Sequence, residues 1–174
     1  MAYKRLFIWV EGRDDELFFN TVIKPLFEQQ YDQVEVRIYA EKTKGYINNF
    51  VKSIEAIQAD YIFTTDINSA LCVTRRKQNT QKVYRRLEAD NIIVIEKEIE
   101  SWYLAGLEDT GLTETGLSVL KNTDTLAKEQ FEQLMPRRFD SRIDFMIEAL
   151  KFFSLEIAKR KNRSLKYFVE KYNL

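Results

Sequence analysis

"FIWVEGRDDELFF", residues 7–19, joins a run of β-forming side chains to a Glu-Gly turn and then to a group of acidic residues. The run over residues 5–10 is apolar at almost every position, which is typical of a strand that is covered on both faces of its sheet. The acids from Asp14 onward suit the first turn of a helix, because the positive end of the helix dipole lies there. Glu11 therefore stands at the carboxyl end of a buried strand.

The same alternation of short apolar runs and longer helical segments continues to about residue 97. Apolar residues that recur three and four apart predict a first helix from near Asp14, with Pro25 kinking it or starting a new turn. Further strands are predicted over 34–39, 61–65 and 91–95, and further helices over about 46–58 and about 74–89, the last with Val83 and Leu87 inward. This order predicts an α/β fold with three layers, a Rossmann-like parallel sheet of about four strands flanked by helices.

Beyond residue 97 the pattern is helical, apart from a stretch rich in Thr and Gly over 109–124 that is expected to be a loop. The ending "SLKYFVEKY" predicts a terminal helix with Ser164 as its N-cap and one apolar face, formed by Leu165, Phe168, Val169 and Tyr172. We expect a single domain over 1–174, with 107–174 as a mostly helical extension packed on the sheet.

Composition excludes several kinds of chemistry. The chain has no His and a single cysteine, Cys72, which excludes disulfide frameworks, Cys/His zinc sites and mechanisms that need an imidazole base. The 27 basic and 27 acidic side chains cancel, so binding to nucleic acid would need a local basic patch. The apolar runs are too short to span a membrane and no signal-peptide pattern is present, so we expect a cytoplasmic protein that does not act on membranes.

Acidic side chains follow three of the predicted strands. Glu11 follows the first, Asp66 follows the third, and Glu96, Glu98 and Glu100 follow the fourth. The carboxyl ends of parallel strands lie at one edge of a sheet, where open α/β sheets bind ligands. Carboxylates brought together repel one another unless a cation neutralises them, and Mg²⁺ or Mn²⁺ prefers such oxygen ligands. The sequence therefore predicts a site for Mg²⁺ or Mn²⁺ at this edge.

Two motifs at these strand ends resemble a known family. The pattern Glu11-Gly12-x-x-Asp15, followed by Asp66-x-Asn68, is similar to that of the Toprim domain, the Mg²⁺-dependent module of topoisomerases, primases and the overcoming-lysogenisation-defect nucleases. The resemblance implies a Toprim-like fold that binds Mg²⁺.

The resemblance extends over most of the chain, from residue 4 to residue 172. "EIESWYLAG", residues 98–106, and the ending "KNRSLKYFVEKY" resemble a group of stand-alone Toprim-like proteins. Trp102 and Tyr103, within the first of these stretches, are expected to pack in the core rather than to stack on nucleic-acid bases.

The resemblance also implies roles for particular residues. Glu11 would be the general acid or base, Asp66 and Asn68 would hold the metal, and Glu100 would complete the acidic cluster. The Toprim pattern normally has Asp where Asn68 stands. An amide oxygen also binds Mg²⁺, but the site then carries one negative charge fewer.

The other acids have competing interpretations. Asp15 either belongs to the site or stabilises the N-terminus of its helix. Glu96 and Glu98 are expected to be solvated, with Glu98 kept as a further candidate ligand. If a helix starts near Glu98, then Glu98 and Glu100 lie on opposite sides of a buried stripe that contains Ile99, and the resemblance selects Glu100.

Basic residues near the predicted site are candidates for binding phosphate. Lys42 and Lys44 lie in the loop after the second strand, at the same edge of the sheet as the acids. "TRRKQNTQKVYRR", residues 74–86, is also basic, but a solvated helix face is the preferred interpretation of that segment. The sequence therefore predicts phosphate contacts from Lys42 and Lys44.

Two functions from different classes follow from these residues. One is a Mg²⁺-dependent phosphodiesterase or nuclease that acts on nucleic acid or a phosphate ester. The other is a non-catalytic module that binds nucleic acid, a nucleotide or a protein partner, with Asn68 marking a degenerate metal site. A PIN-like nuclease or a response-regulator receiver fits less well, because both expect Asp at or close to Glu11.

Overall fold

The computed structural model describes residues 3–118 and 120–174, with Asp109 and Thr110 described by their backbone alone. The chain divides into two compact units, the first ending at Val94 and the second running from Ile95 to Leu174. The packing of residues 107–174 on the sheet stays a prediction. No helix within the described residues is long and apolar enough to cross a membrane.

The first unit is built on a sheet of four strands in the order β2-β1-β3-β4. Its strands are β1 (Arg5–Val10), β2 (Gln33–Ile38), β3 (Asp60–Asp66) and β4 (Ile92–Ile95). Strand β1 pairs in parallel with both β2 and β3, so that Ile8 lies opposite Val36 on one side and Ile62 on the other. The predicted strands are confirmed to within one residue at each end.

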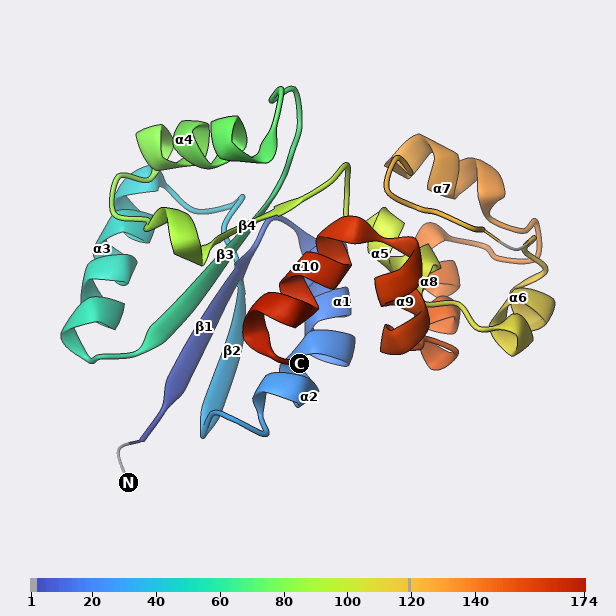
Figure 1. Cartoon of the computed structure of the whole chain (residues 1–174), viewed down its shortest axis with the longest axis horizontal. Coiled ribbons are helices and arrows are strands. Elements are labelled where there is room, and N and C mark those ends of the chain that lie inside the picture. Colours follow the sequence, from blue (N-terminus) through green and yellow to red (C-terminus); the bar gives the residue numbers. More distant parts are fainter. Residues whose placement is uncertain (1–2, 119) are drawn as a thin grey trace. The chain divides into compact units, whose positions relative to one another are not determined.

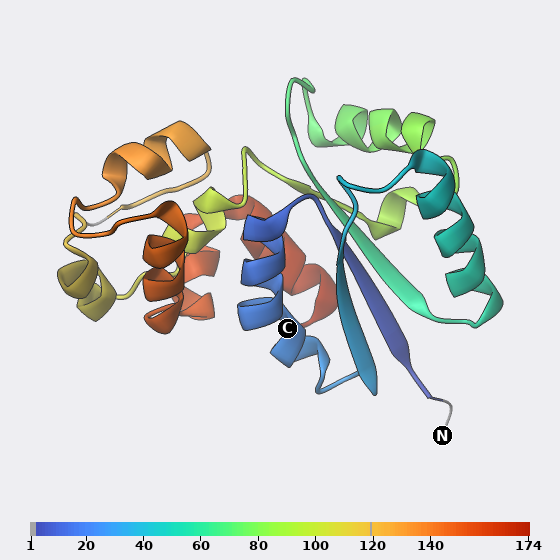
Figure 2. The same cartoon turned by 180° about the vertical axis from the view of Figure 1, so that it is seen from behind.

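Helices cover both faces of this sheet, which makes three layers (Figures 1 and 2). Side chains alternate along β1, so that Phe7 and Trp9 pack on α3 (Lys44–Ala56), with Ile47 and Val51 in the same core cluster. The opposite face carries α1 (Arg13–Phe18) and α2 (Lys24–Phe27). The predicted α/β fold with a parallel sheet is therefore confirmed.

The first predicted helix is divided into segments just before Pro25. Helix α1 is followed by a π-helical segment, η1 (Phe19–Ile23), and then by α2, which has Pro25 in its first turn. The backbone N–H of Lys24 donates to the carbonyl of Phe19, five residues earlier. Since proline has no N–H to continue the α-helical pattern, Pro25 starts a new turn, one of the two predicted outcomes.

Helix α4 (Val73–Val83) is shorter than predicted. The sequence placed Val83 inward, but Val83 ends the helix and is 37% exposed. The chain turns at Tyr84, whose carbonyl accepts the N–H of Leu87 at 3.1 Å, while Gln81 Nε2 donates to the carbonyl of Leu87 at 2.8 Å. Leu87 reaches the core through this turn, so the prediction of one continuous helix to residue 89 was wrong.

Tyr31 joins the connection after α2 to the start of β3, because its hydroxyl donates to Asp60 Oδ2 at 2.9 Å. Burial, followed by the hydrogen bond and the charge of Asp60, raises the pKa of Tyr31 from 10.0 to about 12. A pKa that is raised by folding stabilises the native state fully below about pH 10, and this stabilisation is lost as the pH rises towards about 12.

We therefore expect Tyr31→Phe to lose less unfolding free energy than the wild type between about pH 9 and about pH 11. Urea unfolding at the two pH values measures this difference, with Tyr3→Phe as a control at an exposed tyrosine. Equal losses in Tyr31→Phe and the wild type would contradict the assignment.

The second unit is helical. Its helices are α5 (Glu100–Ala105), α6 (Asp109–Thr115), α7 (Lys128–Leu134), α8 (Arg142–Lys151), α9 (Leu155–Lys161) and α10 (Arg163–Tyr172). All six residues of α5 are buried, and α5 packs against α7, α8 and α9. Trp102 and Tyr103 are both 0% exposed, as expected of core residues.

Helix α6 lies inside the stretch that was expected to be a loop. Leu112 is buried, the Thr115 hydroxyl donates to the carbonyl of Gly111 at 2.5 Å, and Gly116 ends the helix with φ of 77°. Tertiary burial thus overrides the low helix propensity of Thr and Gly, so the loop prediction was wrong over Asp109–Thr115.

The N-cap of α10 also differs from the prediction. Asn162, not Ser164, caps this helix, because its side chain accepts the N–H of Leu165 at 3.0 Å. Ser164 instead lies in the first turn, where its hydroxyl accepts the indole N–H of Trp102 at 2.8 Å. Leu165, Phe168 and Val169 form the buried face as predicted, whereas Tyr172 is only partly buried.

Candidate functional site

A pocket of about 250 Å³ lies in the first unit, where residues at the ends of β1, β2 and β3 meet helix α4. The strand side contributes Glu11, Tyr39, Phe63 and Thr65, and the helix side contributes Arg76, Asn79, Thr80, Val83 and Tyr84. Most of these side chains carry polar groups. The pocket is therefore suited to a polar ligand at the edge of the sheet where the sequence predicted a site.

Glu11 follows β1 and is half-buried, and its orientation is set by Tyr39. The Tyr39 hydroxyl donates to Glu11 Oε2 at 3.2 Å. Burial, followed by the negative charge of Glu11, raises the pKa of Tyr39, and the charge of Asp66 adds to this effect. Tyr39 therefore stays protonated as a hydrogen-bond donor, and the carboxylates of Glu11 and Asp66 both act on its hydroxyl.

Arg76 supplies the positive charge of the pocket. Its Nη2 donates to Thr65 Oγ1 at 2.6 Å, and the Thr80 hydroxyl donates to the Arg76 carbonyl at 3.0 Å. Among residues 3–118 and 120–174, Arg76 Nε is buried without a hydrogen-bond acceptor and no carboxylate forms an ion pair with Arg76. Glu11 and Arg76 therefore line one pocket without neutralising each other directly.

Arg76 was not among the predicted site residues. The preferred sequence interpretation treated the basic helix as a solvated face, which fits the exposed Arg75 and Lys82 but not the half-buried Arg76. The pocket residues of α4 recur at helical spacing, Arg76, Asn79, Thr80 and Val83, which places them on one face. That spacing is the signal by which Arg76 could have been found.

Asp66 is the last residue of β3 and is half-buried, whereas Asn68 is exposed in the turn that follows. Asn68 has φ of 50°, and the N–H of Ala70 donates to the carbonyl of Ile67 at 3.1 Å across this turn. Asn is one of the few residue types that adopt this left-handed conformation readily. The left-handed backbone conformation of this turn thus explains why Asn suits position 68. The role of Asn68 as a metal ligand stays a prediction.

Asp15 closes the N-terminus of α1. It is 7% exposed, and its Oδ2 accepts the backbone N–H of Gly12 at 3.2 Å, as the third residue of the helix does in a capping box. This geometry agrees with the helix-terminal interpretation of Asp15.

Lys42 and Lys44 are exposed and do not line the pocket. Lys42 Nζ lies 5.8 Å from the ring centroid of Tyr46, and Lys44 is the first residue of α3. Their role in phosphate binding stays a prediction, while Arg76 is the cation that the pocket itself contains.

The acids after β4 belong to the second unit, and each has a partner there. Glu100, 4% exposed, accepts from Arg142 Nη1 at 3.2 Å. Glu98 lies two residues before α5, which starts at Glu100, close to the start near Glu98 that the sequence argument assumed. Glu98 Oε2 accepts the backbone N–H of Lys128 at 2.5 Å. Glu96 accepts two hydrogen bonds from the guanidinium of Arg163, at 3.1 and 2.5 Å. The sequence predicted that Glu96 and Glu98 would be solvated. Each instead accepts hydrogen bonds from a partner in the second unit.

The acids at the strand ends of the first unit are the side chains there that could hold a small divalent cation. Within the described residues no group of three or more Asp, Glu, Cys or His side chains is placed to hold a metal ion. Mg²⁺ takes only one or two carboxylates from a protein and completes its coordination with water or substrate phosphate. Glu11 follows β1 and Asp66 ends β3, and both are donors of that kind, although Asp66 does not line the pocket that contains Glu11.

No family model and no curated protein matches this chain. Among solved structures the chain is similar to the C-terminal region of the Xanthomonas campestris pv. campestris OLD protein, with a TM-score of 0.53 and 16% sequence identity. The similarity covers 98% of this chain and 95% of that chain. At this level of identity the similarity concerns the fold alone, and it agrees with the α/β architecture predicted from the sequence. This chain therefore shares its fold with the C-terminal region of an OLD protein.

Proposed function

We propose that this protein is a divalent-metal-dependent phosphodiesterase or nuclease that acts on nucleic acid. The observation that carries the proposal is the pocket at the strand ends, where the Glu11 carboxylate and the Arg76 guanidinium lie without an ion pair between them. A pocket that offers an anion for a metal and a cation for a phosphate suits a phosphodiester. The fold similarity to the OLD protein region supports the same choice.

Glu11 and Asp66 would hold Mg²⁺ or Mn²⁺, with Asn68 and Glu100 as the further ligands that the Toprim resemblance implies. When bound, the ion would stabilise negative charge on the phosphate and on the leaving oxygen. Tyr39 keeps Glu11 in place through its hydrogen bond to Oε2. Held in this way, the Glu11 carboxylate would take a proton from the attacking water or return one to the leaving oxygen.

Arg76 would bind the phosphate. Its Nη2 is held by Thr65, which limits the freedom of the guanidinium plane, and the planar group can donate two parallel hydrogen bonds to phosphate oxygens. The cost of leaving this cation without a carboxylate partner would then be offset when an anionic substrate enters the pocket.

Cleavage assays test the proposal. The purified protein is incubated with single-stranded and double-stranded DNA, RNA and a bis-aryl phosphodiester, each with Mg²⁺, Mn²⁺ or a chelator. We expect cleavage that requires the metal. Inactivity on all of these substrates, with metal binding confirmed by calorimetry, would instead support the non-catalytic binding module.

The acids after β4 provide a separate prediction about the metal. We expect Glu100→Gln to weaken Mn²⁺ binding by at least about tenfold, on the order of 1.4 kcal/mol, and Glu96→Gln and Glu98→Gln to change it much less. Glutamine at position 100 can still accept the hydrogen bond from Arg142, so the loss would report the missing charge. Calorimetric titration of the three variants measures it, and a larger loss for Glu98→Gln would show that the ligand was misassigned.

A further inference from the structure

A second pocket, of about 490 Å³, lies in the second unit beside the turn between α9 and α10. Its basic lining residues are Lys159, Arg160, Lys161, Arg163 and Lys166. Three acids, Asp124, Glu156 and Glu170, also line it, so the lining carries more positive than negative charge. The chain as a whole is neutral, which makes this pocket a local basic patch of the kind that nucleic-acid binding would require.

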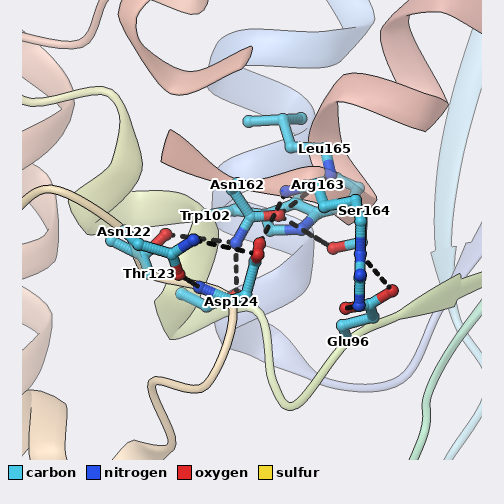
Figure 3. A network of polar contacts seen from close by, with 10 residues as sticks. Glu96, Trp102, Asn122, Thr123, Asp124, Asn162, Arg163, Ser164 and Leu165 are labelled. Atoms are coloured by element: carbon cyan, nitrogen blue, oxygen red, sulfur yellow. Dashed lines mark hydrogen bonds and ion pairs between the residues drawn. The ribbon is translucent and has the colours of Figure 1, made fainter. Parts of the chain in front are cut away.

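The turn that shapes this pocket is held by a buried hydrogen-bond network around Asn162, which is 1% exposed (Figure 3). Asn162 Nδ2 donates to Ser101 Oγ at 3.2 Å and to Thr123 Oγ1 at 3.1 Å. Asn162 Oδ1 accepts from Ser164 Oγ at 2.9 Å and from the N–H of Leu165 at 3.0 Å. The backbone that carries the basic side chains is therefore preorganised.

Two acids near this turn, Asp124 and Glu96, accept hydrogen bonds from Arg163 at the start of α10 (Figure 3). Asp124 Oδ1 accepts the backbone N–H of Arg163 at 2.6 Å, and Glu96 accepts from the Arg163 guanidinium. These contacts fix the start of α10 and engage Arg163.

Among the other basic side chains that the structure describes, Lys161 donates to the carbonyl of Leu107 at 3.2 Å, whereas Lys159, Arg160 and Lys166 are held only weakly or not at all by carboxylates. Lys159 pairs with Glu156, and Lys166 with Glu170 at 3.7 Å, in both cases with an exposed carboxylate on the same helix. Exposed pairs of this kind contribute little to stability, so a stronger anion can replace them. Arg160 is exposed and forms no ion pair within residues 3–118 and 120–174. The pocket therefore has cations that a polyanion can bind at small cost.

We propose that this pocket binds the sugar–phosphate backbone of nucleic acid independently of sequence. Among the residues that the structure describes, its lining consists of Asn, Asp, Glu, Lys and Arg, with no aromatic ring on which a base could stack. The proposal rests on the proposed function in naming nucleic acid as the partner, but binding at this pocket requires neither the metal nor cleavage.

The test measures binding of a fluorescent duplex DNA by anisotropy in the presence of a chelator, over a range of salt concentrations. We expect the double variant Arg160→Gln with Lys166→Gln to weaken binding at least about tenfold at about 50 mM salt and to reduce the salt slope by about two. Arg137→Gln with Lys151→Gln is the matched control, because Arg137 is exposed and Lys151 pairs with Glu148 on its own helix as Lys166 does with Glu170.

Equal binding by the wild type and the double variant, or an equal loss in the control, would overturn the proposal. Binding to anionic lipid vesicles without binding to DNA would overturn it as well. Because cleavage is not measured, a catalytically inactive protein that binds DNA through Arg160 and Lys166 would support this proposal and contradict only the proposed function.

Discussion

Glu11→Gln is expected to reduce metal-dependent phosphodiester cleavage by about 100-fold to 10,000-fold while the chain stays folded. Glutamine can neither exchange a proton nor contribute negative charge to a metal. Its amide oxygen can still accept the hydrogen bond from Tyr39, so the pocket should keep its shape. The measurement is the cleavage rate of a bis-aryl phosphodiester at saturating Mn²⁺, with circular dichroism to confirm folding.

Glu41→Gln is the control for this experiment, since Glu41 is exposed and does not line the pocket. It should leave the rate within about twofold of the wild type, as surface substitutions usually do. If Glu11→Gln retains more than about a tenth of the wild-type rate, proton transfer by Glu11 is not required, because general acid–base catalysis typically contributes at least about 100-fold.

Asn162→Ala is expected to reduce the unfolding free energy by about 2–4 kcal/mol. The substitution removes the N-cap of α10, which typically contributes about 1 kcal/mol. It also leaves the buried hydroxyls of Ser101, Thr123 and Ser164 without their bonds to Asn162, and lost partners of this kind cost about 1–3 kcal/mol. Urea unfolding followed by circular dichroism measures the change.

Two further variants separate the components of this effect. Asn162→Asp keeps an oxygen that can accept the N–H of Leu165 but loses the donors to Ser101 and Thr123, so its loss should be intermediate. Asn49→Ala, at an exposed position of α3, should change stability by less than about 0.5 kcal/mol. An effect of Asn162→Ala as small as that of Asn49→Ala would show that the network contributes little.

The strands of this protein could be predicted from the sequence because their signals are local. Residues 5–10 form a short apolar run that ends in a Glu-Gly turn, and the three later runs have the same character. Side chains buried on both faces produce such runs, whatever the rest of the chain does. The positions of Glu11 and Asp66 at strand ends follow directly, since the carboxyl ends of parallel strands share one edge.

The site itself needed the tertiary structure. Arg76 enters the pocket only because α4 packs with one face towards the ends of the strands, where Thr65 holds its guanidinium. Arg75 and Lys82 on the same helix are also basic, but they are exposed to solvent. A charged residue on a polar helix carries no local mark that distinguishes these two environments.

The same limit explains the errors in the second unit. Asn162 bonds Ser101 and Thr123, which are 61 and 39 positions away in the chain, and Ser164 accepts from Trp102 across 62 positions. Helix α6 forms where Thr and Gly predicted a loop because Leu112 is buried. Sequence by itself determined the strands and the acids at their ends through local hydrophobic patterns and turn chemistry. Tertiary structure decided the pocket cation, the cap of α10 and the existence of α6, since each depends on contacts between residues that are distant in the chain.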